Sequence, residues 1–233
     1  MIIDILTLFP RMFEGPLSES IIKIAREKRL VEINIYNIRD FADPPYYQVD
    51  DYAYGGGAGM ILKVEPIDKL LKEILKDKRK TKKDIILMTP QGEPFTQELA
   101  HRLARKEYLI IICGHYKGID ERIHEFYKID EISIGDYILS SGEVATLVMV
   151  DAIVRLLPGV IKDINSAWTD SFSDDLLDAP YYTRPEEFMG KRVPEVLLSG
   201  NHQKITEWRQ KMREKLTKTR RPDLYEKYLK SIK

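Results

Sequence analysis

The sequence is poor in the residues that build disulfide bonds and metal sites. It has one cysteine, Cys113, and four histidines, His101, His115, His124 and His202. A single cysteine cannot form a disulfide within the chain, and Cys113 stands in an apolar run, so we interpret it as a structural thiol in a reducing compartment. The histidines lack the His-Glu-x-x-His pattern and any pairing with cysteines, so no metal site is predicted.

Neither an excess of charge of one sign nor a long hydrophobic run is present. The 37 basic residues balance the 37 acidic ones, so any signal for nucleic-acid binding must be local. No segment resembles a membrane span, and residues 1–9 are too few for a signal peptide and carry Asp4 instead of basic residues. We therefore expect a cytoplasmic protein with no membrane partner.

Motifs of two common enzyme classes are also missing. The glycine-rich segment 55–59 is not followed by Gly-Lys-Ser or Gly-Lys-Thr, so binding of a nucleoside triphosphate is not predicted. No Gly-x-Ser-x-Gly sequence occurs, which argues against a serine hydrolase of that type. The length of 233 residues suits one large domain or two smaller ones.

Strand and helix patterns alternate along most of the chain, which indicates an α/β fold with a parallel sheet. Thr96 and Ser141 are predicted helix N-caps. Residues 39–59 form an irregular segment that is too long for a plain connector, so we favour a functional role over a surface loop. The expected strands are 2–9, 31–38, 85–88, 109–113 and 129–134. The expected helices are 17–28, 65–75, 96–107 and one that begins after Ser141. This last helix carries Val144, Leu147, Val148 and Ala152 along one face.

Glycine-bearing loops break the apolar strands between residues 109 and 148. Gly114-His115-Tyr116-Lys117-Gly118 follows one strand, Gly135-Asp136-Tyr137 follows the next, and Ser140-Ser141-Gly142 leads into a helix. Each glycine by itself fits an ordinary tight turn. Two loops beside a helix N-terminus together predict a cradle for a small ligand.

The sign of the charge changes in the last third of the chain. Residues 163–195 hold eight acidic and three basic residues, which suggests a linker and the entry to a domain. Residues 200–233 hold eleven basic and four acidic residues, mostly on helices expected at 204–216 and 222–229. Interleaved Trp208, Tyr225 and Tyr228 suit a phosphate backbone and exposed bases. A plain helical hairpin with a solvated basic face fits the pattern equally well.

A set of short motifs, in one order from end to end, resembles a known family. They are Leu8–Phe13, Val49–Asp51, Tyr54–Met60, Thr89–Gly92, the sequences GHYKGIDER at 114–122 and SIGDYILSSGE at 133–143, Pro158–Val160, Asp170–Phe172, Leu176–Asp178, Tyr182–Pro185, Val193-Pro194 and Leu197–His202. The family is that of the bacterial tRNA guanosine-37 N1-methyltransferases, TrmD, of the SPOUT class. Two positions depart from its usual pattern: Lys117 replaces an acidic residue and Ser141 replaces a glycine.

The resemblance implies a parallel α/β sheet that ends in a deep trefoil knot, one of the rare exceptions to unthreaded chains. It implies three parts: a SPOUT domain at 1–161 that binds S-adenosylmethionine, an interdomain linker at 162–170, and a small, mainly helical domain at 171–233 that binds the anticodon arm of tRNA. It also implies a homodimer whose active sites are shared between chains. Magnesium dependence belongs to the family, but no carboxylate cluster in the sequence identifies its ligands.

The residues expected to bind the cofactor are carried over from the resemblance. They lie in the three loops that follow the strands near 88, 113 and 133, where backbone shape matters more than side chains. The expected set is Thr89, Pro90, Gln91, Gly92, Gly114, Tyr116, Gly118, Ser133, Ile134, Gly135, Asp136, Tyr137, Ile138, Leu139 and Gly142.

Two further residues match the family's catalytic positions. Asp170 matches the general base, and Arg155 matches the key arginine. Guanine N1 carries a proton at neutral pH, so a positioned carboxylate must remove it before N1 can attack the methyl group. Negative charge then moves onto O6, where a guanidinium can stabilise it. Two alternatives remain: another SPOUT RNA methyltransferase, and a non-catalytic RNA-binding relative.

Overall fold

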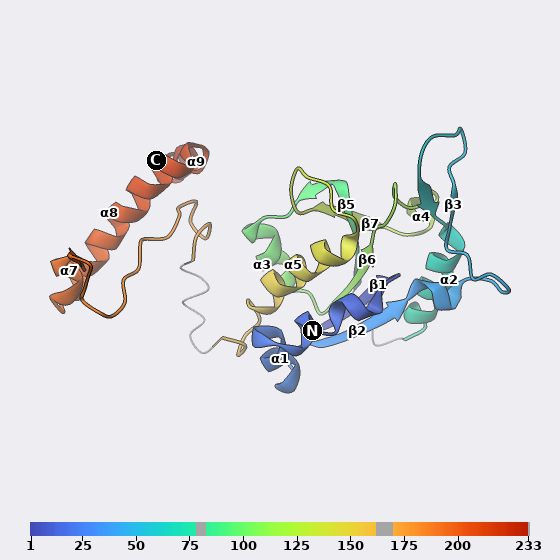
Figure 1. Ribbon diagram of the computed structural model, residues 1–233, viewed down its shortest axis with the longest axis horizontal. Helices are drawn as coiled ribbons and strands as arrows, with labels where there is room; N and C mark the ends of the chain where they lie inside the picture. Colours follow the sequence, from blue (N-terminus) through green and yellow to red (C-terminus); the bar gives the residue numbers. More distant parts are fainter. Residues whose placement is uncertain (78–82, 162–169, 233) are drawn as a thin grey trace. The chain divides into compact units, whose positions relative to one another are not determined.

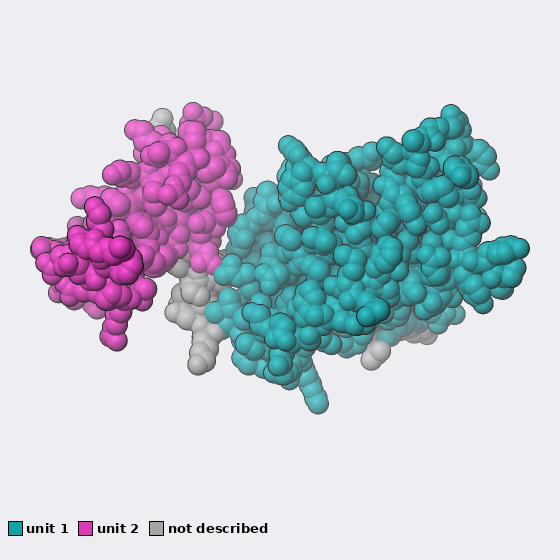
Figure 2. Space-filling model, viewed as in Figure 1, with its two compact units in different colours: residues 1–164 teal, residues 165–233 magenta. Residues whose placement is uncertain are grey.

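The computed structural model describes residues 1–77, 83–161 and 170–232. The chain divides into two compact units, residues 1–164 and 165–233, which Figure 2 shows in different colours. The predicted linker, except for Asp170, lies outside the described residues.

The first unit is built on a five-stranded parallel sheet (Figure 1). The strand order β2-β1-β6-β5-β7 places β6 at the centre, and β6 is buried along its whole length, as its continuous apolar run predicts. The α/β fold with a parallel sheet is therefore confirmed. The strands are β1 (Ile2–Thr7), β2 (Glu32–Asn37), β5 (Lys83–Pro94), β6 (Tyr108–Cys113) and β7 (Ile129–Ser133).

Alternate residues of the central strands point into two separate apolar cores. Leu109, Ile111 and Cys113 belong to one core, whereas Ile110 and Ile112 belong to the other. Helices α1 (Ser20–Glu27), α3 (Gln97–Ala104) and α5 (Gly142–Val154) cover the first face, and α2 (Val64–Leu75), α4 (Ile123–Phe126) and the short 3-10 helix η3 (Ile38–Phe41) cover the second. Two further 3-10 turns, η1 (Pro10–Phe13) and η2 (Pro16–Ser18), lead from β1 to α1.

The N-cap residues of α3 and α5 are those predicted from the sequence, but the face of α5 that was predicted from its apolar spacing is not the buried one. Thr96 caps α3, because its Oγ1 accepts a hydrogen bond from the Leu99 amide at 3.2 Å. Ser141 is the N-cap residue of α5, although its side chain makes no capping hydrogen bond. The face that carries Val144 and Val148 is the exposed one, at 44% and 48%, because α5 is apolar on nearly all sides and its opposite face packs on the sheet.

Strand β5 does not end at Met88, so the prediction of a short strand there was wrong. It continues to Pro94 with a shift in register against β7 between Met88 and Glu93. Gly92 permits this path, because a Cβ at this position would collide with the backbone of Glu131 and Ile132. The sequence Pro-Gln-Gly therefore forms a bulge within the strand, and the loop signal alone could not show that pairing resumes.

The expectation of a wholly irregular segment at 39–59 was also wrong in part. After η3, the strands β3 (Asp50–Tyr52) and β4 (Met60–Leu62) form an antiparallel pair that flanks the glycine-rich residues 55–59. The Lys117 amide donates to the Met60 carbonyl at 3.1 Å, and the Leu62 amide donates to the Gly118 carbonyl at 3.0 Å. This pair of strands is therefore fixed to the loop that follows β6.

The second unit is mainly helical. It contains the helices α7 (Glu195–Leu198), α8 (His202–Arg220) and α9 (Pro222–Ser231). A small antiparallel hairpin precedes them, and its strands β8 (Glu187–Phe188) and β9 (Lys191–Arg192) have two residues each. Helix α8 starts earlier than predicted because Asn201 accepts a hydrogen bond from the Lys204 amide at 3.1 Å. The buried Thr217 accepts a hydrogen bond from the Leu177 amide at 2.8 Å, which ties the entry segment to α8.

Candidate active site

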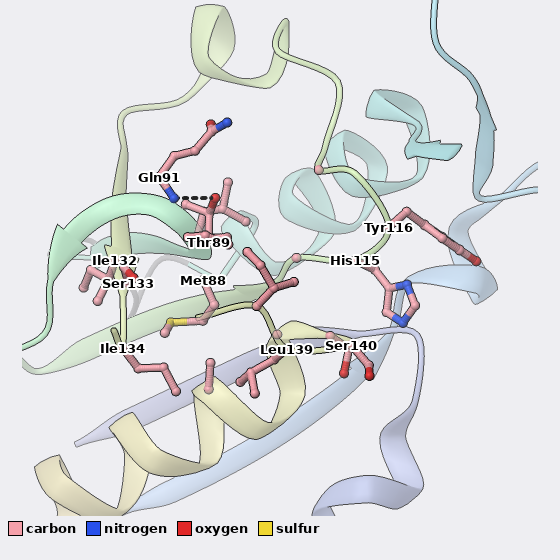
Figure 3. Close-up of a pocket in the computed structure, with 18 of the residues that line it drawn as sticks. Met88, Thr89, Gln91, His115, Tyr116, Ile132, Ser133, Ile134, Leu139 and Ser140 are labelled. Atoms are coloured by element: carbon pink, nitrogen blue, oxygen red, sulfur yellow. Dashed lines mark hydrogen bonds between the residues drawn. The ribbon is translucent and has the colours of Figure 1, made fainter. Parts of the chain in front are cut away.

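A cavity of about 440 Å³ lies at the carboxyl ends of β5, β6 and β7 and beside the first turn of α5 (Figure 3). Ligands of α/β proteins bind at this edge of the sheet, and sites for small molecules span about 300 to 1,000 Å³. Figure 3 shows Thr89 and Gln91 on one side and His115 and Ser140 on the other, with Met88, Ile134 and Leu139 nearer α5.

Glycines bring the three loops together by close backbone contact. A Cβ on Gly114 would lie 2.5 Å from the Met88 carbonyl oxygen, and a Cβ on Gly142 would lie 2.6 Å from the Gly114 amide nitrogen. The Gly142 amide donates to the Gly114 carbonyl at 2.7 Å, and His115 forms an antiparallel bridge with Ser141. The start of α5 is thus held directly against the loop after β6, and no side chain fits between them.

Most residues predicted to bind the cofactor line this cavity. The lining includes Thr89, Pro90, Gln91, Gly114, Tyr116, Gly118, Ser133, Ile134, Gly135, Tyr137, Ile138, Leu139 and Gly142. Gly92 and Asp136 are not in the lining: Gly92 packs against β7, and the side chain of Asp136 is exposed. For the residues that line the cavity, binding of the cofactor stays a prediction. For Gly92 and Asp136, the geometry of the cavity gives that prediction no support.

Nine lining residues are not in the set expected to bind the cofactor, although four of them, His115, Lys117, Ser140 and Ser141, stand in the loops predicted to form a ligand cradle. The other five, which sequence reasoning missed, are Leu87, Met88, Ile119, Ile132 and Ala145. Leu87, Met88 and Ile132 belong to apolar strand runs, where the sequence offers no signal that separates a core residue from a wall residue. Of the described residues that line the cavity, only Lys117 carries a formal charge at neutral pH with histidine taken as neutral.

The loop after β6 also contacts the segment at 39–59. Tyr116 has a φ of 58°, a left-handed conformation that a bulky residue adopts only when its surroundings hold it there. Burial, together with the nearby carboxylate of Asp50, raises the pKa of the Tyr116 hydroxyl. The rim of the cavity is therefore linked to β3, which supports the preference for a functional role of this segment.

A buried polar cluster lies behind the cavity, where α5 meets β1 and β6. The Thr7 hydroxyl donates to Glu143 Oε1 at 2.5 Å and accepts a hydrogen bond from the Phe9 amide at 2.9 Å. Glu143 is 1% exposed, and its Oε2 has no partner among the described residues. Burial, followed by the charge of Glu143, raises the pKa of the Cys113 thiol, so this cysteine stays protonated and unreactive.

We expect Thr7→Val to lower the free energy of unfolding by about 1 to 3 kcal/mol, because it leaves the buried Glu143 and the Phe9 amide without this partner. Chemical denaturation of the variant measures the change. The double variant Thr7→Val/Glu143→Leu removes both polar side chains and should recover part of the loss. A double variant less stable than the sum of the single changes would contradict this account of the pair.

The two predicted catalytic residues belong to different units. Arg155 is the C-cap residue of α5 and is half-buried, at the opposite end of the helix from the cavity. Asp170 opens the described part of the second unit, where its carbonyl accepts a hydrogen bond from the Ser173 amide at 3.3 Å. A compact turn follows it, since the Asp178 amide donates to Ser171 Oγ at 2.9 Å. The geometry of each residue is defined only within its own unit.

A family model described as tRNA (Guanine-1)-methyltransferase TrmD matches residues 1–227. The chain belongs to the TrmD family. Proteins named tRNA (guanine-N(1)-)-methyltransferase are similar over nearly the full chain. That of Anoxybacillus flavithermus is 53% identical over 98% of this chain and 93% of its own length, and that of Carboxydothermus hydrogenoformans is 56% identical over 96% and 87%. That of Geobacillus kaustophilus is 54% identical over 98% and 93%.

Two observations on this TrmD-family chain concern metals and membranes. Within residues 1–77, 83–161 and 170–232, no three side chains of histidine, cysteine, aspartate or glutamate come together as ligands for a metal ion. None of the helices in these ranges combines the length and the apolar character that crossing a membrane requires.

Proposed function

We propose that this protein transfers the methyl group of S-adenosylmethionine to N1 of the guanosine at position 37 of tRNA, beside the anticodon. The substrates are tRNAs with guanosine at position 36, and the modification supports maintenance of the reading frame. The observation that carries the proposal is the cavity between three glycine-bearing loops in a chain that matches the TrmD family over residues 1–227.

The cavity fits the cofactor by the chemistry of its wall. Aliphatic side chains such as Leu87, Ile134 and Leu139 suit the faces of a purine, and backbone groups of the loops suit its edges and the ribose. When bound, S-adenosylmethionine supplies an electrophilic sulfonium methyl group. Attack on such a methyl group requires no nucleophile from the enzyme, so these residues act by orientation, which can contribute several kcal/mol to lowering the barrier.

The remaining chemistry concerns the guanine. A carboxylate oxygen of Asp170 would accept the N1 proton as N1 attacks the methyl group, and the bond from that methyl group to sulfur would break to leave a neutral thioether. The guanidinium of Arg155 stabilises the negative charge that develops on O6 in the active site of the other protomer, because in its own chain it lies at the opposite end of α5 from the cavity. The described residues hold no cluster of side chains suited to magnesium, so no magnesium ligands are assigned.

A knot and a homodimer complete the proposal. The knot is supported by the contact of Gly142 with Gly114, which holds the returning chain against the loop after β6. The homodimer is supported by exposed apolar side chains on α5, on the adjacent η1 and on the residue before η1, namely Val144, Val148, Met12 and Phe9. With active sites shared between chains, Asp170 of one protomer serves the cofactor domain of the other.

In this proposal the first unit binds the cofactor and the second unit binds the tRNA. Residues 1–161 form the cofactor domain, 162–170 the linker, and 171–233 the domain that grips the anticodon arm. The eleven basic residues at 200–233 supply attraction for the phosphate backbone. Such an enzyme acts in the cytoplasm, where tRNA is matured.

The proposal is tested by methyl transfer from labelled S-adenosylmethionine to an unmodified tRNA transcript with guanosine at 36 and 37, followed by mapping of the methylated atom. Label at N1 of position 37 is expected. A transcript with adenosine at 37 serves as the control and should stay unlabelled. Label at another position or on a ribose would favour another SPOUT methyltransferase, and cofactor binding without transfer would favour a non-catalytic relative.

A further inference from the structure

The second unit has a cavity of its own, of about 500 Å³. It lies between the extended segment 180–186, α7 and α8. Apolar side chains form one part of its wall, and two tyrosines and two arginines form another. The lining residues are Pro180, Tyr181, Tyr182, Thr183, Arg184, Glu186, Val193, Leu197, Leu198, Ile205 and Arg209.

The tyrosines present aromatic surface that other side chains hold in place. Tyr182 packs beside Trp208 with ring centroids 6.3 Å apart, yet it is 50% exposed. The hydroxyl of Tyr181 donates to Asp178 at 2.7 Å, and the guanidinium of Arg209 lies 5.9 Å from the centre of its ring. Tyr181 is 68% exposed. Ordered aromatic rings with accessible faces are the platforms on which unstacked bases bind.

The charge around this cavity favours an anion. Its one acidic lining residue, Glu186, is paired with Arg192 at 2.7 Å. Arg184 and Arg209 make no ion pair with any described residue of the chain. A ligand that combines a flat ring with a negative charge matches both features, and a nucleotide of a single-stranded RNA loop is such a ligand.

We propose that this cavity receives one unpaired nucleotide of the tRNA, distinct from the methylated guanosine. Its base stacks on Tyr182, and its phosphate lies near Arg184 and Arg209. The inference rests on the proposed function, since it takes tRNA as the substrate. It adds a binding site in the second unit that is separate from the cofactor cavity.

The test compares tRNA binding by the full-length variants Tyr182→Ala, Tyr182→Phe and Phe188→Ala. Phe188 is the matched control, because it is an aromatic residue of the same unit that is 67% exposed and lies outside the cavity lining. Loss of one stacked base should weaken tRNA binding by about 5- to 150-fold for Tyr182→Ala. Tyr182→Phe keeps the ring and should bind like the unsubstituted protein, as should Phe188→Ala.

A second readout separates stacking from charge. The slope of the logarithm of the binding constant against the logarithm of the salt concentration counts the ions released on binding. Tyr182→Ala should leave this slope unchanged, whereas Arg209→Met should reduce it by about one. The fluorescent base 2-aminopurine, placed in turn at each unpaired position of the anticodon loop, should be quenched at one position by the unsubstituted protein and not by Tyr182→Ala.

Three results would overturn the inference: equal effects of Tyr182→Ala and Phe188→Ala, a defect in Tyr182→Phe as large as that in Tyr182→Ala, or no position quenched. Circular dichroism and thermal unfolding report whether the second unit of each variant is folded, because affinity for S-adenosylmethionine reports only on the first unit. If the unsubstituted protein binds and methylates tRNA but Tyr182→Ala is unaffected, only this inference fails. If it does not methylate tRNA at all, the proposed function fails first.

Discussion

Replacing Asp170 with asparagine is expected to slow methyl transfer by about 10²- to 10⁴-fold, the range that a positioned general base contributes. Asparagine has nearly the same shape as aspartate but cannot accept the N1 proton. The chemical step is measured under single-turnover conditions with saturating cofactor and tRNA, so that slow product release does not hide the effect. Affinities for cofactor and tRNA should stay within a few-fold of those of the unsubstituted protein.

Asp223→Asn is the matched control for this substitution. Asp223 is an exposed carboxylate of the same unit, and its partner is Arg221 at 2.6 Å on the surface. Loss of a surface ion pair has little effect on stability, so this variant should keep full activity. Retained activity in Asp170→Asn would refute the assignment of the base. A loss of tRNA binding in that variant, with chemistry intact once bound, would make Asp170 a substrate contact only.

The substitution Gly142→Ala is expected to weaken binding of S-adenosylmethionine by about tenfold or more. The added methyl group would lie 2.6 Å from the Gly114 amide nitrogen and 3.0 Å from two backbone atoms of Cys113. Backbone atoms cannot move aside as a flexible side chain can, and overpacking of this kind costs about 1 to 3 kcal/mol. The loop after β6 must therefore shift, which alters the wall of the cavity. Calorimetric titration with the cofactor measures the result.

Gly15→Ala controls for the general effect of replacing glycine. No heavy atom lies within 4 Å of a Cβ built on Gly15, and its φ of −68° suits alanine. This variant should bind the cofactor normally and be no less stable. Unchanged affinity in Gly142→Ala, with the fold intact, would show that the cavity wall tolerates the shift and that its close packing does not determine cofactor binding.

The position of the cavity could be predicted from the sequence because the signals there are local. Continuous apolar runs such as Leu109–Cys113 fix the strands, and glycines directly after them fix the loops. The bulge around Gly92 could not be predicted, since its cause is the backbone of Glu131 and Ile132, about forty residues further along the chain. The same holds for the pairing of β3 with β4, which depends on anchoring to the loop after β6.

The exposed face of α5 shows a second limit of sequence patterns. Val144 and Val148 are as apolar as Met149 and Val150, yet the first two are exposed and the last two are fully buried. A helix that is apolar all round has no periodicity that distinguishes its core face from a face for a partner. The face of α5 that is buried is the one that packs on the sheet, α1 and α3.

The sequence by itself determined the α/β class, the positions of the five strands of the parallel sheet apart from the far end of β5, the cap of α3 and the family. These features depend on neighbouring residues or on motifs in order. Only the tertiary structure decided which residues form the wall of the cavity at the ends of β5, β6 and β7, the burial of Glu143 against Thr7, and the cavity beside Tyr182 in the second unit. These features join residues far apart in the chain. Their contacts arise from packing, which no local pattern encodes.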